Sequence, residues 1–230
     1  MARGWTMVVG AVGLALSGCG APLVTDLAIG TSVPCGWHGE AAPAGVRSYR
    51  DVLPNTRFRE RGSDEPAAPL TPLVVVGEVV AVAPGPGWTE AGDRVGFDDD
   101  AVLWKHAHAT VAVAEVIGSA GWSSDTVTVA FPLEAHEDLG QARHILETMG
   151  RTVFPLYRGE GVGYAPDVWS VGPADAVLIA EVGAGGRLAL PCVRPRRAAR
   201  LLVDVPTLAE LRRAAAGPLR ERVVRATHRD

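Results

Sequence analysis

The feature that most constrains the fold of this chain is a series of short β-branched and small apolar runs separated mainly by turn residues. The first run, residues 73–82, contains six valines. Such composition favours strands over helices. The predicted strands span residues 73–82, 109–117, 127–131, 152–157, 176–182 and 187–190. Because few helical patterns lie between them, the sequence predicts a mainly β fold, an antiparallel sheet or barrel.

Glycine and proline mark the expected irregularities of this sheet. Residues 84–87 are rich in both and predict a turn, and residues 183–186 predict a hairpin between the last two strands. Pro155 interrupts the fourth predicted strand. Since proline cannot donate a backbone hydrogen bond, that strand is expected at an edge.

Two segments have helical patterns. Residues 137–149 space apolar side chains at helical intervals, and Gly150 can end that helix. Thr207 and Glu210 form a capping-box pattern before residues 208–216, and Gly217 follows them. The sequence predicts a C-terminal helix over 208–216.

The N-terminus has the layout of a secretory signal peptide. Arg3 precedes an uncharged stretch over residues 4–18 with an apolar centre and small residues at its end. A transmembrane helix is the alternative, but this stretch is shorter than the roughly 20 residues that cross a bilayer. We therefore assign residues 1–18 to a signal peptide.

The segment ends in Leu16-Ser17-Gly18-Cys19, which resembles the lipobox of bacterial lipoproteins. The resemblance implies cleavage before Cys19 and a diacylglycerol, carrying chains such as palmitate, on the Cys19 sulfur. Two acyl chains anchor a protein stably, since each buried methylene contributes about 0.8 kcal/mol. The expected location is the extracytoplasmic side of the cell membrane, with the lipid anchor as the membrane contact.

Cys35 and Cys192 remain once Cys19 is lipidated. An even pair of cysteines in an exported chain predicts a disulfide. Two unrelated thiols are the alternative, and a metal site is disfavoured because neither cysteine belongs to a C-x-x-C pair.

The sequence divides into a signal peptide (1–18), a lipid-anchored tether (19–72) and a β-rich domain with a basic helical end (73–230). Seven prolines and few apolar runs mark most of the tether. Residues 194–230 contain ten arginines against four acidic residues, while the whole chain has a formal net charge of −4. An acidic chain gives phosphate backbones little to bind, so nucleic acid is not an expected partner.

Residues 73–79 (LVVVGEV), 110–118 (TVAVAEVIG) and 127–129 (VTV) resemble the opening strands of netrin-like, OB-fold-related exported domains. The resemblance covers residues 73–131 and implies an OB-like barrel. The N-terminal cysteine arrangement that carries protease inhibition in that family is absent here, so no inhibitory function follows.

Candidate catalytic residues are few. His106 and His108, with the loop from Asp98 to Asp100, could bind a divalent metal, although a solvated edge is the simpler interpretation. His136-Glu137 begins like a zinc-protease motif, but Gly140 stands where its second histidine belongs. No G-x-S-x-G or P-loop motif occurs. We predict no catalytic residues, metal or cofactor.

Four tryptophans fall in or beside predicted loops: Trp88, Trp104, Trp122 and Trp169. They either form a ligand-binding surface or cover the ends of the barrel. The sequence favours a non-catalytic lipoprotein that binds a protein, glycan or small ligand. The alternative is an exported hydrolase or metal-dependent enzyme using His106, His108 and Asp98 to Asp100.

Overall fold

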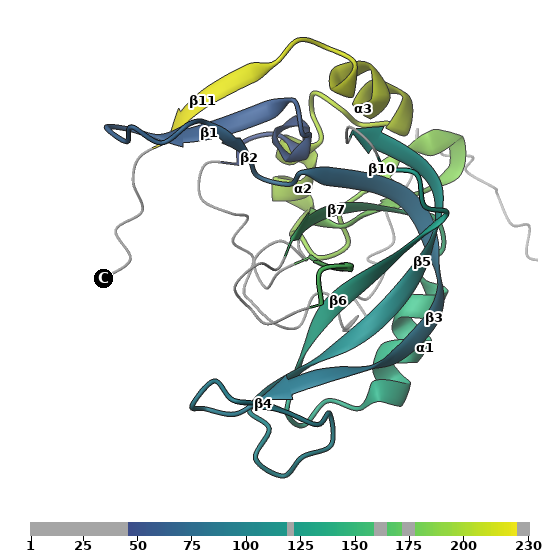
Figure 1. Ribbon diagram of the computed structural model, residues 1–230. Coiled ribbons are helices and arrows are strands. Elements are labelled where there is room, and N and C mark those ends of the chain that lie inside the picture. Colours follow the sequence, from purple (N-terminus) through teal and green to yellow (C-terminus); the bar gives the residue numbers. More distant parts are fainter. Residues whose placement is uncertain (1–45, 119–121, 159–164, 172–177, 225–230) are drawn as a thin grey trace, which may run out of the picture. The chain divides into compact units, whose positions relative to one another are not determined.

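Two long strands dominate the computed structural model, which describes residues 46–118, 122–158, 165–171 and 178–224. Strand β3 (Leu73–Trp88) pairs antiparallel with β5 (Trp104–Gly118), and β5 pairs antiparallel with β6 (Thr126–Glu134) (Figure 1). β3 runs straight through residues 84–87, so the predicted turn is wrong. The pairing of β3 with β5 instead shifts in register between Pro84 and Gly87. Glycine and proline are common at such irregular positions, where the regular backbone hydrogen bonds are interrupted.

Five strands form a ring. Strand β7 (Thr152–Arg158) pairs with the start of β3, and β8 (Val168–Ser170) pairs antiparallel with β7 and parallel with β6. The order β3-β5-β6-β8-β7 therefore returns to β3, although the ring is not evenly closed. With 43% of the described residues in strands and 20% in helices, the predicted mainly β, OB-like fold is confirmed.

Three short strands extend the sheet. Strand β4 (Arg94–Val95) pairs with the end of β3, and β9 (Ala180–Val182) pairs with both β7 and β10 (Leu188–Ala189). The antiparallel β9–β10 pair, joined by the 3-10 turn η4 (Ala184–Gly186), confirms the predicted hairpin. Gly185 and Gly186 have positive φ angles of 67° and 75°, which glycine adopts without strain.

Strand β7 is not at an edge as predicted, because it pairs with β3, β8 and β9. Its contacts with β9 involve Thr152 and Val153, and those with β8 involve Tyr157 and Arg158. Pro155 falls between these two pairings, where neither strand requires a hydrogen bond from its nitrogen.

Helices occupy the predicted places. Helix α1 (Leu139–Thr148) is capped by Asp138, packs beside β3, and contributes Ala142 and Leu146 to the core inside the ring (Figure 1). Helix α3 (Leu208–Ala215) begins at Thr207, whose hydroxyl accepts a hydrogen bond from the Glu210 amide at 3.3 Å. Helix α2 (Pro195–Leu201) is an addition that the sequence did not reveal.

The folded part of the chain begins earlier than predicted. Residues 46–72, assigned above to a tether, form the 3-10 helix η2 (Tyr49–Val52) and strands β1 (Thr56–Glu60) and β2 (Ala68–Pro69). Tyr49, Val52 and Leu53 are completely buried in a second core that packs η2, α2 and α3 against the outer face of β3. The scattered prolines obscured this segment, since its apolar residues are too few to show periodicity.

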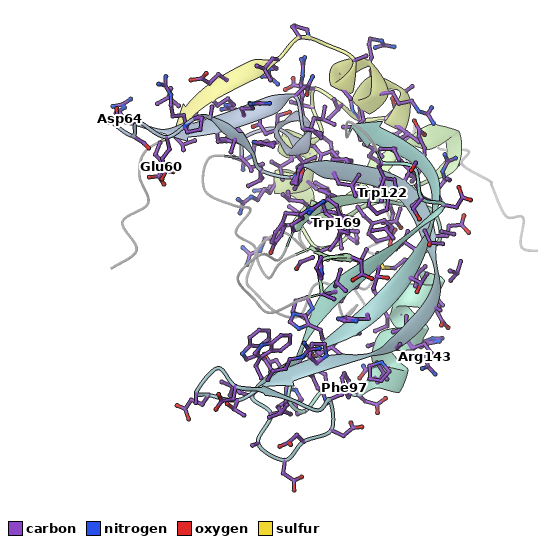
Figure 2. All side chains as sticks on the ribbon, in the orientation of Figure 1. Glu60, Asp64, Phe97, Trp122, Arg143 and Trp169 are labelled. Atoms are coloured by element: carbon purple, nitrogen blue, oxygen red, sulfur yellow. The ribbon has the colours of Figure 1, made fainter. Side chains whose placement is uncertain are left out.

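A small sheet of order β11-β1-β2 stands beside this second core, with Glu60 and Asp64 at its far end (Figure 2). Strand β11 (Arg220–Val224) pairs in parallel with β1. The buried Asp51 carboxylate accepts a 2.5 Å hydrogen bond from Arg222 and thereby ties β11 to η2.

The chain divides into two units, Met1–Gly30 and Thr31–Asp230. The predicted signal peptide, the lipid-bearing Cys19 and Cys35 all lie outside the described residues. No helix in the described ranges is long and apolar enough to span a membrane.

Candidate functional site

The candidate site is an aromatic cluster where β3, β4 and β5 meet. In register, Arg94 lies opposite Trp88, and Trp88 lies opposite Trp104, so the three side chains project from one face of the sheet. The two indoles are stacked, with ring centroids 4.2 Å apart and planes 5° apart. His106 meets both edge-on, at 4.8 Å from Trp88 and 5.0 Å from Trp104. We call Trp88, Trp104, His106 and His108 the Trp–His cluster.

His106 is a buried member of this cluster, with 3% of its surface exposed. Burial, and secondarily the neighbouring His108, lowers the pKa of His106 to about 3. Its imidazole is therefore neutral at physiological pH and serves packing and hydrogen bonding rather than charge.

His108 lies two residues further along β5 and is partly exposed. Its pKa is lowered, mainly by burial and then by Arg94, while Asp167 acts in the opposite direction. Arg94 belongs to the β3–β5 connection, and Asp167 comes just before β8. Opposite charges from two segments that are distant in the sequence therefore act on the pKa of His108.

Gly85 makes room for the His108 ring. A Cβ atom at Gly85 would lie 2.7 Å from both Cδ2 and Nε2 of His108, too close for any side chain. The His108 Nε2 atom is enclosed and has no hydrogen-bond partner within the described part of the chain. A buried imidazole nitrogen in this state is available to a ligand or an ordered water.

The alternative interpretation, a metal site of His106, His108 and the loop from Asp98 to Asp100, is not assembled in the described part of the chain. Asp98, Asp99 and Asp100 do not contribute to the pKa shifts of His106 or His108. The Asp99 carboxylate instead accepts a 2.9 Å hydrogen bond from the Ala101 amide within its own loop. No group of three or more His, Cys, Asp or Glu side chains that could hold a metal occurs among the residues described.

Ser170 and His108, a serine and a histidine that a hydrolase could use together, do not form a pair. In register, His108 of β5 lies opposite Ala130 of β6, which in turn lies opposite Ser170 of β8. The His108 ring, however, lies over Gly85 of β3, on the side of β5 away from β6. Lys105, the single lysine, projects from the opposite face of β5, where its ammonium lies 4.3 Å from the centre of the Phe97 ring.

The four tryptophans form two pairs. Trp122 meets Trp169 edge-on at 5.8 Å, and Figure 2 shows these two side chains together within the upper part of the ring. The Arg158 guanidinium lies 5.4 Å from the Trp169 ring. Trp88 and Trp169 are 5% and 6% exposed and fill core space, whereas Trp104 and Trp122 are partly exposed. The covering role therefore applies to one member of each pair.

Sequence reasoning missed Arg94, Asp167 and Gly85. Their roles depend on the sheet register and on the approach of residues near 167 to β5, neither of which leaves a local signal. The alternation of Trp104, His106 and His108 was the one visible indication, since alternate residues share a strand face.

Cys192, the only cysteine among the described residues, packs against the second core. Cys35 lies outside the described residues, so the disulfide between Cys35 and Cys192 remains a prediction. No family model, curated protein or solved structure matches this chain.

Proposed function

We propose that this chain is an extracytoplasmic lipoprotein, anchored through Cys19, whose OB-like barrel binds a ligand at the Trp–His cluster. The proposal for the anchor rests on the lipobox at residues 16–19 and on the short apolar segment before it. The proposal for binding rests on the geometry of the cluster.

The observation that carries the binding proposal is that the Trp104 indole is partly exposed and stacked on the buried Trp88. Trp88 and the edge of His106 fix the Trp104 indole in place, so little side-chain entropy is lost when a ligand packs on it. His108, Arg94 and Asp167 add a neutral imidazole and two opposite charges nearby. These groups suit a polar, ring-containing ligand such as a glycan.

The β3–β5 loop beside the cluster is rich in acidic residues, which disfavours an anionic ligand. Residues 98–100 are three consecutive aspartates in the β3–β5 connection, and Glu90 and Asp93 belong to the same loop. A strongly anionic ligand would be repelled there, whereas sugar hydroxyls can donate hydrogen bonds to carboxylates. A neutral glycan therefore fits better than a nucleic acid.

An array of glycans and peptides probed with the detergent-solubilised full-length protein tests the binding proposal. Trp104→Ala should reduce binding of the captured ligand at least tenfold, because it removes the exposed stacking surface. Leu103→Ala is the matched control, since Leu103 is 55% exposed and lies outside the cluster. Equal binding by the Trp104→Ala variant would assign the ligand to another surface.

The anchor is tested separately in a bacterial host fed an alkyne fatty-acid analogue. Cys19→Ser should abolish labelling and leave the precursor uncleaved or misprocessed. Continued labelling of the serine variant would contradict the anchor without affecting the binding proposal.

A further inference from the structure

Buried polar atoms without partners gather at one place in this protein, away from the Trp–His cluster. In the described ranges, six enclosed side-chain nitrogen or oxygen atoms lack a hydrogen-bond partner. Five of them belong to residues 49–55 and to the first residue of β11. Enclosed polar atoms of this kind are rare in folded proteins and indicate a bound water, ion or ligand.

Three of the five residues surround the C-terminal end of α3. The Asn55 side-chain amide donates to three carbonyl oxygens there, including that of Gly217, at 2.9 to 3.2 Å. The Asn55 backbone carbonyl accepts a hydrogen bond from the Arg220 amide at 2.8 Å. Arg50 Nη2 lies 3.4 Å from where a Cβ atom of Gly217 would stand. The Arg220 backbone is therefore joined to Asn55, and the Arg50 guanidinium lies beside Gly217, to which Asn55 also bonds.

The charges at this junction do not cancel. Asp51 is its buried carboxylate, and the Oδ2 atom accepts from Arg222 and from the amides of Arg47 and Ser48, the last two at 2.9 and 3.1 Å, while Oδ1 is enclosed without a partner. Arg50 and Arg220 are half-buried and form no ion pair within the described residues. Arg50 Nε and Arg220 Nη1 each present an enclosed N–H group without an acceptor.

We infer that Arg50, Arg220 and Asn55 form a binding site for a phosphate group. Two guanidinium groups without a carboxylate favour an anion, and arginine binds phosphate oxygens with good geometry. The Asn55 side-chain nitrogen donates to carbonyl oxygens at the end of α3, so its oxygen, Oδ1, is the atom left enclosed without a partner. An amide oxygen can only accept a hydrogen bond. The ligand must therefore also donate a hydrogen bond.

This last requirement separates phosphate from sulfate. Inorganic phosphate and phosphomonoesters retain a protonated oxygen for part or all of the time near neutral pH, whereas sulfate has none. Hydrogen phosphate can pair with all three groups, the two cationic donors of Arg50 and Arg220 and the Asn55 Oδ1 acceptor, whereas sulfate leaves Asn55 Oδ1 unpaired.

Thermal unfolding of the detergent-solubilised full-length protein tests this site, with phosphate, sulfate and chloride compared at equal ionic strength near pH 6.5. At a phosphate concentration ten times Kd, the folding equilibrium shifts about elevenfold, which raises Tm by about 3–6 °C for a domain of this size. Sulfate should give a clearly smaller shift. Equal shifts with phosphate and sulfate, or no shift with phosphate, would overturn the inference.

Variants locate the effect. Arg50→Gln and Arg220→Gln should each remove the phosphate-specific shift, while Arg57→Gln, at an exposed arginine on β1, should keep it. If Arg50→Gln and Arg220→Gln both keep the phosphate-specific rise in Tm, phosphate does not bind at this site. If those variants do not fold, isothermal titration of the unmodified protein still decides, because phosphate must then give a saturable binding heat and sulfate must bind clearly more weakly.

The phosphate group can belong to a free small molecule or to a lipid headgroup. Flotation with phosphatidylcholine vesicles containing phosphatidic acid, using the Cys19→Ser protein, distinguishes them. Recruitment that inorganic phosphate competes away assigns the headgroup, and a phosphate-dependent Tm shift without recruitment assigns a free phosphate compound. Absence of both contradicts the inference.

Discussion

His106 shows how far a residue's chemistry depends on its surroundings. Its spacing from His108 suggested a metal ligand, yet the side chain is buried edge-on against two stacked indoles and its pKa is lowered to about 3. Alternation along a strand predicted that the two imidazoles share a face, and they do. It did not predict that Trp88 and Trp104 would close over one of them, because that contact depends on pairing across β3 and β5.

The burial of His106 predicts acid sensitivity. Its pKa is 6.5 in the unfolded chain and about 3 in the folded protein, so between these values the unfolded chain binds the additional proton. Stability therefore falls as pH drops from about 6.5 to 3, by on the order of 4 kcal/mol in total from this residue. Urea unfolding of His106→Phe should show a shallower pH dependence over that window.

The matched control for this experiment is His136→Phe. The His136 side chain is 78% exposed, so replacing it should leave the pH dependence as it is in the unmodified protein. A His106→Phe variant whose stability declines as steeply as the unmodified protein between pH 6.5 and 3 would show that His106 is not the acid-sensitive group.

Elements with a strong local pattern could be predicted from the sequence, and elements fixed by distant partners could not. Residues 208–216 were predicted as a helix from Thr207, Glu210 and Gly217, and α3 spans Leu208–Ala215. Strands β1 and β11 escaped prediction because each is rich in arginine and glutamate, and because they pair with each other across most of the chain. Their stability comes from that pairing rather than from apolar alternation.

The capping interaction of α3 gives a prediction for a single element. The Thr207 hydroxyl accepts from the Glu210 amide and donates to the Glu210 carboxylate at 2.8 Å. Thr207→Ala removes both bonds and should lower the free energy of unfolding by about 1 kcal/mol. Thr207→Ser keeps the hydroxyl and should restore most of the loss. Urea denaturation that finds the alanine and serine variants equal would show that the cap does not stabilise α3.

At the scale of the whole chain, the sequence predicted the OB-like ring but misplaced where folding begins. The ring depends on long valine-rich strands, whose composition is evident locally. The second core is built from residues near 50, 75, 180 and 210, and no local pattern reveals that such distant segments pack together. The predicted tether therefore ended inside the folded part.

Cys192 belongs to the segment between β10 and α2, beside this second core. The other two cysteines are Cys19 and Cys35. A bond to Cys19 would occupy the sulfur that the lipobox assigns to lipid, so we predict that Cys192 pairs with Cys35. This bridge closes a loop of about 157 residues. The chain-entropy model gives such a loop close to 5 kcal/mol of stabilisation as an upper figure.

Since many domains have a total stability of only about 5–15 kcal/mol, reduction should clearly lower the Tm of the Cys19→Ser protein. Cys35→Ala in that background should lower Tm to the same extent, and reduction should then add nothing, because both changes open the same loop. A thiol assay on unfolded, unreduced Cys19→Ser protein decides the pairing. It should detect no reactive thiol, whereas two reactive thiols would mean that Cys35 and Cys192 are unpaired and that the stability of this chain depends on its two cores alone.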